Sequence, residues 1–167
     1  MTNPRKPFRI NVGFIVHEEI GYTSEFTFDI PKAEIEDFVL SNVTGSAHVG
    51  RTQQGLIVQG HFSGDTALEC VRCLNDFSRH LVWEFAELYA FDQDSVSESG
   101  LILPESAQID LAPLLREYAL LEVPISPLHV PDCKGLCVEC GQDLNLKDCG
   151  HRQHEDDSPF SVLKKLL

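Results

Sequence analysis

The six cysteines of this chain fall into two clusters, and their spacing constrains the fold more strongly than any other feature of the sequence. Each cluster contains a C-x-x-C pair, and the two pairs lie far apart in the chain. Two such pairs supply four thiolates, which Zn²⁺ binds in a closed tetrahedron. The spacing therefore predicts a structural zinc ion that ties distant segments together. The first cluster consists of Cys70 and Cys73, and the second of Cys133, Cys137, Cys140 and Cys149.

Three ligand sets fit this spacing, and the roles of Cys133, Cys149 and His129 therefore stay open. The glycine at position 141 favours the second C-x-x-C pair as a metal-binding turn, because glycine adopts backbone conformations that other residues resist. His151 lies beside Cys149 in sequence, but the simpler interpretation of that histidine is a polar tail. In order of preference, the sets are Cys70, Cys73, Cys137 and Cys140; then Cys133, Cys137, Cys140 and Cys149; then Cys70, Cys73, Cys133 and His129.

The chain contains no apolar run long enough to cross a bilayer, and its N-terminus leads into an alternating segment rather than an apolar signal core. We therefore expect a cytoplasmic protein without a membrane partner. Thiols stay reduced in that compartment, so clustered cysteines there bind metal or perform redox chemistry more often than they form disulfides. Redox catalysis is the weaker hypothesis, because Cys70 and Cys73 lie between expected strands and not at the start of a helix.

The charge balance disfavours general attraction to nucleic acid. The 167 residues include 13 basic and 26 acidic side chains, which gives a net charge of −13. Such a chain repels phosphate backbones and suits a basic protein partner. The sequence also lacks a G-x-S-x-G elbow, a phosphate-binding glycine loop with lysine and an H-E-x-x-H motif. We therefore expect no enzymatic activity and assign no catalytic residue.

The periodicity of apolar residues predicts one α+β domain over residues 1–167, built on a curved antiparallel sheet or barrel-like core. Residues 1–91 are expected to be mainly β-structure, and residues 108–167 to form a helix, a cysteine-rich zinc-knuckle loop and a C-terminal helix. Trp83 is assigned to the core. Strands are expected at 8–16, 25–30, 43–49, 56–68 and 77–91, with Pro31 ending the second strand. The small residues Gly45, Gly60 and Gly64 suggest bulges or sharply curved strands.

Residue types typical of helix N-termini mark the start of two expected helices. Asp110 is a suitable N-cap for a helix from about 111 to 121, and Pro113 lies in its first turn. Ser158 and Pro159 are typical of the start of a closing helix at 158–167. The first C-x-x-C pair is expected on a turn between the strands at 56–68 and 77–91.

Two stretches resemble a known family. Residues 70–74 read Cys-Val-Arg-Cys-Leu and resemble the C-x-R-C-L motif of the YceD family. Residues 133–145 resemble that family's C-K-G-L-C-x-x-C-G-x-x-L-N signature. The segment from Ile109 to Pro124 is similar to the helix before the signature, and residues 158–163 to the closing helix. The resemblance covers most of residues 40–167, whereas the first forty residues match only in strand character.

The resemblance implies a role in the accumulation of large-subunit ribosomal RNA. On this interpretation, the chain is a non-enzymatic ribosome-biogenesis factor that promotes the synthesis, processing or accumulation of 23S ribosomal RNA. Its partner would be ribosomal RNA or a pre-ribosomal particle, contacted directly or through a basic ribosomal protein. Zinc would fix the loop that presents Lys134, Asn145 and their neighbours. The alternative is a zinc-stabilised adaptor that binds a basic ribosomal or assembly protein and makes no RNA contact.

Overall fold

The computed structural model describes residues 6–151, which divide into two compact units. Within the described residues, unit 1 comprises 6–67 and Ser78–Ile125, and unit 2 comprises Leu68–Phe77 and 126–151. The elements are strands β1 (Arg9–Asn11), β2 (Thr23–Ile35), β3 (Phe38–Arg51), β4 (Gly55–Glu69), β5 (Asp76–Ala90) and β6 (Gln108–Asp110), helices α1 (Gly13–Val16) and α2 (Ala112–Leu121), and the short 3₁₀ helix η1 (Gln93–Ser95).

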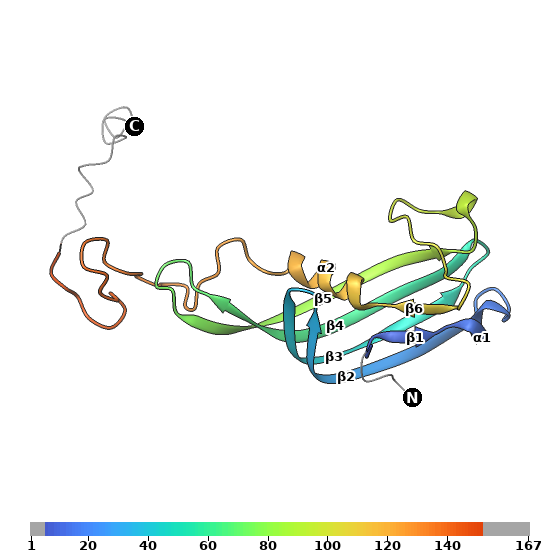
Figure 1. Ribbon diagram of the computed structural model, residues 1–167, viewed down its shortest axis with the longest axis horizontal. Coiled ribbons are helices and arrows are strands. Elements are labelled where there is room, and N and C mark those ends of the chain that lie inside the picture. Colours follow the sequence, from blue (N-terminus) through green and yellow to red (C-terminus); the bar gives the residue numbers. More distant parts are fainter. Residues whose placement is uncertain (1–5, 152–167) are drawn as a thin grey trace, which may run out of the picture. The chain divides into compact units, whose positions relative to one another are not determined.

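A four-stranded sheet of long strands forms the framework of unit 1. Its strands follow in the order β2-β3-β4-β5, and the two registers β2–β3 and β3–β4 are antiparallel (Figure 1). The expected α+β architecture with an antiparallel sheet is therefore confirmed. The barrel-like alternative is wrong, because β2 and β5 lie at opposite edges of this sheet and do not pair with each other.

Strand β2 runs past the proline that was expected to end it. The register pairs Ile30 with Val43 and Lys32 with Ser41, and Pro31 lies between these two pairs. Because β2 is an edge strand, a residue without an N–H group is tolerated where that group would face outward. The strand then ends at a turn in which Glu36 takes a φ of 56°.

Of the glycines in β3 and β4, Gly64 lies at a bulge as expected, whereas Gly45 and Gly60 permit close contact between strands. The β3–β4 register pairs Ser41 with Asp65 and Thr44 with Ser63, so its irregularity lies opposite Gly64. A Cβ atom on Gly45 would overlap the carbonyl oxygen of His61 on the paired strand, and a Cβ atom on Gly60 would overlap the ring of Phe85. The absence of a side chain at these positions is therefore what lets β3, β4 and the aromatic core approach one another.

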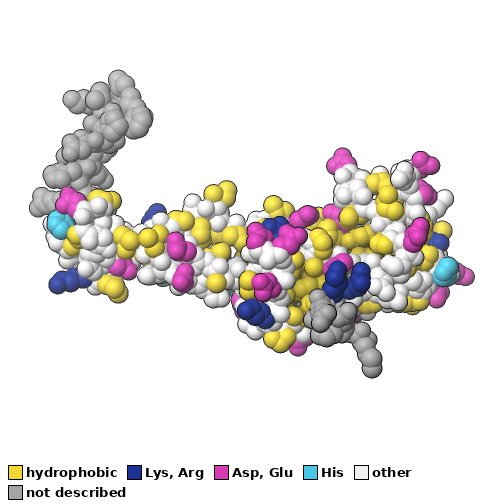
Figure 2. All heavy atoms as spheres, viewed as in Figure 1, with side chains coloured by type: hydrophobic (Ala, Val, Ile, Leu, Met, Phe, Trp, Pro, Cys, Tyr) yellow, Lys and Arg dark blue, Asp and Glu magenta, His cyan; other side chains and the backbone are white. Residues whose placement is uncertain are grey.

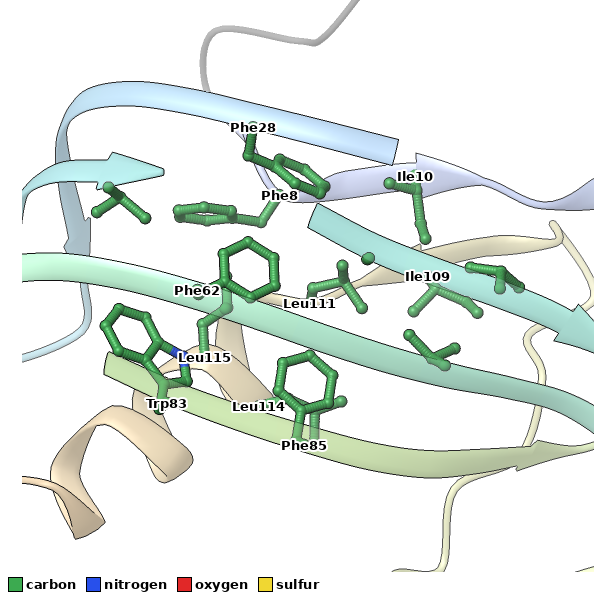
Figure 3. Close-up of a cluster of buried hydrophobic side chains, with 14 of the residues drawn as sticks. Phe8, Ile10, Phe28, Phe62, Trp83, Phe85, Ile109, Leu111, Leu114 and Leu115 are labelled. Atoms are coloured by element: carbon green, nitrogen blue, oxygen red, sulfur yellow. The ribbon is translucent and has the colours of Figure 1, made fainter. Parts of the chain in front are cut away.

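One face of the sheet buries a chain of aromatic rings. Phe28, Phe62 and Phe85 follow one another with ring centroids 5.4 and 6.1 Å apart, and Trp83 stacks on Phe62 (Figure 3). Trp83 is only 3% exposed, which confirms its place in the core. Tilted and stacked pairs of this kind add to the stability that comes from burying apolar area.

A small second sheet and a helix complete this core. Strand β1 pairs with β6, and Phe8, Ile10 and Val12 alternate inward as the sequence predicted. The expected strand at 8–16 is nevertheless too long, because the chain turns into α1 once Asn11 accepts a hydrogen bond from the Gly13 N–H. As a result, Phe14 is half-exposed instead of joining the inward stripe.

Helix α2 confirms the helix expected at 111–121 to within a residue. The Asp110 carboxylate accepts a hydrogen bond from the Ala112 N–H at 3.2 Å, while Leu111 occupies the N-cap position itself. Leu114 and Leu115 lie toward the core (Figure 3). The closing helix expected at 158–167 lies outside the described residues. Among residues 6–151, neither helix has the length and apolarity that a bilayer crossing requires.

The close approach at Gly45 gives a testable consequence. We expect Gly45→Ala to lower the free energy of unfolding by about 1–3 kcal/mol, because the new methyl group must displace the backbone of the neighbouring strand. Gly64→Ala is the matched control, since its methyl group would meet its nearest atoms at ordinary contact distances from 3.4 Å. Urea unfolding followed by circular dichroism measures both variants, and equal losses in the two would contradict this account.

Candidate metal centres

The turn between β4 and β5 forms the first metal-binding geometry in unit 2. The Cys70 N–H donates to the Asn75 carbonyl and the Leu74 N–H donates to the Cys70 carbonyl, both at 2.9 Å. This closed turn points the thiols of Cys70 and Cys73 toward one location, and Leu74 takes a φ of 59° to close it. The prediction that the first C-x-x-C pair lies on a turn between two strands is confirmed.

Residues 126–136 bring two further ligands to that turn. The Sγ atoms of Cys70 and Cys133 lie 3.7 Å apart, and the Cys73 Sγ lies 3.2 Å from Nδ1 of His129. The four ligand atoms lie within 4.8 Å of one another, and the three cysteines are at most 4% exposed. We call Cys70, Cys73, His129 and Cys133 the buried cluster. Three thiols and an imidazole at this separation form a donor set that Zn²⁺ accepts.

Polar groups around the buried cluster hold the two segments together. The Val71 N–H donates to the Pro127 carbonyl at 3.0 Å, and the Arg72 guanidinium donates to the Cys133 carbonyl at 2.8 Å. The side-chain amide of Asn145 donates to the Cys133 sulfur at 3.4 Å. Such partners of the ligands orient them and tune a bound metal. Apolar side chains of Phe77, Leu128 and Leu136 pack against the same cluster.

A second group of ligands follows in residues 137–151. Cys137, Cys140, Cys149 and His151 also place their ligand atoms within 4.8 Å of one another. We call these four residues the exposed cluster. Cys137 is buried, but Cys140 and His151 are exposed and Cys149 is half-buried. The Cys137 Sγ lies 3.8 Å from Nδ1 of His151.

The thiols of the buried cluster ionise unequally. Burial opposes ionisation of Cys70, but hydrogen bonds from His129 and from neighbouring backbone amides outweigh it and hold the pKa of Cys70 at about 5. Burial, together with the contacts with Cys70 and Cys133, raises the pKa of Cys73 to about 11 against a backbone hydrogen bond at Asn75 that lowers it. At neutral pH the Cys70 thiolate therefore stands beside the Cys73 thiol, which is a state that attracts a metal cation.

In the exposed cluster, too, the pKa of one thiol is lowered and that of another is raised. Hydrogen bonds from the backbone amides of Cys140 and Glu139 lower the pKa of Cys137 to about 6. A backbone hydrogen bond at His151 lowers the pKa of Cys149, but contacts with Cys137, burial and the contact with Cys140 together outweigh it, and the net shift is upward. Each cluster therefore has its first thiolate on the first cysteine of a C-x-x-C pair.

The structure does not bring the four cysteines of the preferred ligand set together. The reason is that the β4–β5 turn is covered by residues 126–136, through the Val71 and Arg72 hydrogen bonds, so the nearest donors come from that segment. Which residues bind a metal stays a prediction. Cys70 and Cys73 join Cys133 and His129, as in the third set, whereas Cys137 and Cys140 join Cys149 and His151, a combination that was not among the three sets.

Two residues make hydrogen bonds to Cys133 that the sequence did not predict. Arg72 is the arginine of the C-x-R-C-L motif, and its contact with the Cys133 carbonyl explains an arginine between the two cysteines. Asn145 was expected to be presented outward with Lys134. Asn145 is exposed, and its side chain in addition accepts from the Lys134 N–H at 2.8 Å and donates to the Cys133 sulfur. The signature could have indicated this contact, since it begins at Cys133 and ends at Asn145.

The glycine of the signature has a steric explanation. Gly135 takes a φ of 78°, and a Cβ atom there would lie 3.0 Å from the Arg72 carbonyl oxygen. The Leu136 N–H donates to that same oxygen at 3.0 Å. Only glycine combines the left-handed conformation with this close approach, so Gly135 lets the signature segment pack on the first C-x-x-C turn.

Comparison with known proteins places these motifs in a family. Residues 58–167 match the family model described as large ribosomal RNA subunit accumulation protein YceD. An uncharacterised protein of Mycobacterium bovis is 31% identical over 125 residues, which cover 71% of this chain and 59% of the relative. The chain therefore spans about three fifths of the length of that relative.

More distant relatives carry informative names. A chloroplastic protein of Arabidopsis thaliana, named large ribosomal RNA subunit accumulation protein YCED homolog 1, is 33% identical over 63 residues, or 38% of this chain and 20% of the relative. The YlbN protein of Bacillus subtilis is 27% identical over 107 residues, or 63% of this chain and 62% of the relative. No solved structure gives a significant match. Because the family model covers well over half of the chain and both C-x-x-C pairs, the chain belongs to the YceD family.

Proposed function

We propose that this chain is a non-enzymatic ribosome-biogenesis factor that promotes the synthesis, processing or accumulation of large-subunit ribosomal RNA. The family match over residues 58–167 carries this proposal, because it includes both C-x-x-C turns and the segments that pack on them. The name of the plant relative supports the same role. The physical part of the chain would be to present a fixed surface to a pre-ribosomal particle.

We further propose that the buried cluster holds a structural Zn²⁺. The residues fit the ion, since three thiols and one imidazole converge within 4.8 Å, and one thiol has a pKa of about 5. A closed tetrahedral site of this kind contributes directly to folding free energy. The surrounding residues do the positioning: Arg72 fixes the backbone at Cys133, and Asn145 connects the Cys133 sulfur to the backbone of Lys134.

A zinc-stabilised adaptor with a basic protein partner is the second candidate. The net charge of −13 favours it. Asp and Glu side chains are distributed over unit 1 and outnumber Lys and Arg on the face shown (Figure 2). Such a surface suits a basic ribosomal or assembly protein better than bare RNA, and an adaptor of this kind would still act in ribosome assembly.

Crosslinking in growing cells separates these two candidates. We expect chemical crosslinking of the tagged chain to give protein adducts with a basic partner, and ultraviolet crosslinking to give few RNA adducts, because the acidic surface repels phosphate. Mass spectrometry of the crosslinked products identifies the adducts. RNA adducts that map to large-subunit precursors would exclude the adaptor and favour direct binding.

The role in ribosome assembly gives a genetic prediction. We expect deletion of the gene in its native host to lower the ratio of large- to small-subunit ribosomal RNA, and expression of the Cys133→Ser variant to restore it poorly. The matched control is Val71→Ser, which lies in the first C-x-x-C turn but has an exposed side chain and donates only through its backbone. An unchanged ratio in the deletion strain, measured by electrophoresis of total RNA, would refute the proposed function.

Metal removal gives a biochemical prediction that is independent of the ribosome. We expect chelation under denaturing and then refolding conditions, or the Cys133→Ser substitution, to lower the free energy of unfolding by more than about 4 kcal/mol, because a lost structural metal leaves buried ligands unpaired. Urea unfolding and elemental analysis measure the effect, again with Val71→Ser as control. Absence of zinc in freshly purified, reduced wild-type protein would contradict the prediction.

A further inference from the structure

The exposed cluster is built on the same backbone turn as the buried cluster. In the second C-x-x-C turn, the Cys137 N–H donates to the Gln142 carbonyl and the Gly141 N–H donates to the Cys137 carbonyl, both at 2.8 Å. These two bonds repeat, at the same offsets, the two bonds that close the turn at Cys70. Gly141 takes a φ of 72°, which corresponds to the φ of 59° at Leu74.

Each of the two turns also stands at the end of an antiparallel pair of segments. The first connects β4 to β5, and the second is flanked by an antiparallel bridge between Leu136 and Asp143. A C-x-x-C turn closed in this way presents two sulfurs on one side, as tetrahedral zinc sites require. The local structure at Cys137 and Cys140 is therefore that of a metal-binding turn in its own right.

Cys149 and His151 complete a second set of four donors. Nδ1 of His151 lies 3.8 Å from the Cys137 sulfur, while Nε2 of the same ring lies 3.9 Å from the Glu139 carboxylate. A carboxylate on the far side of an imidazole orients the ring and increases its basicity as a metal ligand. Glu139 is therefore placed on the Nε2 side of the ring, although 3.9 Å is longer than a hydrogen bond.

Little else holds the ligand-bearing segment in place. Residues 144–151 contain no helix or strand. At Gly150, the N–H donates to the side chain of Asp148, which is a local turn. Within the described residues, side-chain contacts of Cys149 and His151 with the second turn are what join residues 148–151 to it. A metal ion bound by all four donors would hold residues 148–151 against the second C-x-x-C turn.

We propose that the exposed cluster is a second, separate Zn²⁺ site, and that its ion exchanges with solution far more readily than the ion of the buried cluster. Three thiols and an imidazole match the ligand preferences of zinc. The difference in exchange follows from burial: Cys70 and Cys133 are 0% and 1% exposed, whereas Cys140 and His151 are exposed, so water and chelators reach the second site directly. The proposal does not depend on the ribosomal role.

Metal stoichiometry of single variants tests this proposal. We expect the reduced wild-type chain, purified with zinc present, to hold about two zinc ions, one for each set of four donors. Cys140→Ser should lower the content to about one while leaving the main unfolding transition in place. Val138→Ser is the matched control, because Val138 lies between the two cysteines of the same turn and is 83% exposed. Elemental analysis and circular dichroism give the two readouts.

A second variant and a kinetic measurement make the test independent of one substitution. Cys149→Ser should remove the same ion as Cys140→Ser, and the double variant should lose no further zinc. When a chromogenic zinc chelator is added to the wild-type chain, we expect one equivalent to be released at least tenfold faster than the other, and the fast phase to be missing in both variants. Release of the second equivalent should require denaturation or thiol modification.

Three results would overturn the proposal. The wild-type chain could hold a single zinc ion that Cys140→Ser does not remove, which would leave the exposed cluster without metal. It could hold a single ion whose loss in Cys140→Ser abolishes the main unfolding transition, which would indicate one shared site. Two ions released at the same rate would contradict the exchange difference. A chain with two distinct zinc ions but no effect on ribosomal RNA would refute the proposed function alone.

Discussion

Unit 2 depends on the contact between the β4–β5 turn and residues 126–136. Unit 2 has few other sources of order, since outside the ends of β4 and β5 its described residues contain neither helices nor strands longer than an isolated bridge. The Cys70–Cys133 and Cys73–His129 contacts, the Arg72 hydrogen bond and the close approach of Gly135 all act at this one place. Without these contacts, little described in unit 2 would hold residues 126–136 against the turn.

Unit 1 is stable for a different reason. Its long strands bury a continuous set of aromatic and branched side chains, which helix α2 and the β1–β6 pair cover. This core follows ordinary rules of apolar burial and includes none of the candidate metal ligands. The division explains why the two kinds of sequence signal are separate: alternating apolar residues specify unit 1, and cysteines with glycines specify unit 2. The family match over residues 58–167 covers both C-x-x-C turns of unit 2 together with α2, β5 and most of β4.

The sequence predicted local secondary structure better than it predicted which distant segments contact each other. The strands at 56–68 and 77–91, the turn at Cys70 and the helix at 111–121 follow from periodicity and from the C-x-x-C spacing, which act over a few residues. The pairing of Cys70 and Cys73 with His129 could only be left open, because nothing in the spacing states which segment covers the β4–β5 turn. Pro31 was misjudged since tolerance of proline depends on whether a strand lies at an edge, and that is a property of the whole sheet.

The two clusters differ in how far apart along the chain their members lie. Cys70 and Cys133 are 63 positions apart, whereas Cys137 and His151 are 14 apart. Closing a long loop costs more entropy than closing a short one, and contacts between distant residues form later. During synthesis, the hairpin of β4 and β5 is complete well before its remaining donors emerge. The nascent chain therefore carries Cys70 and Cys73 without His129 and Cys133, the residues that lie beside them in the folded protein, until translation has passed residue 133.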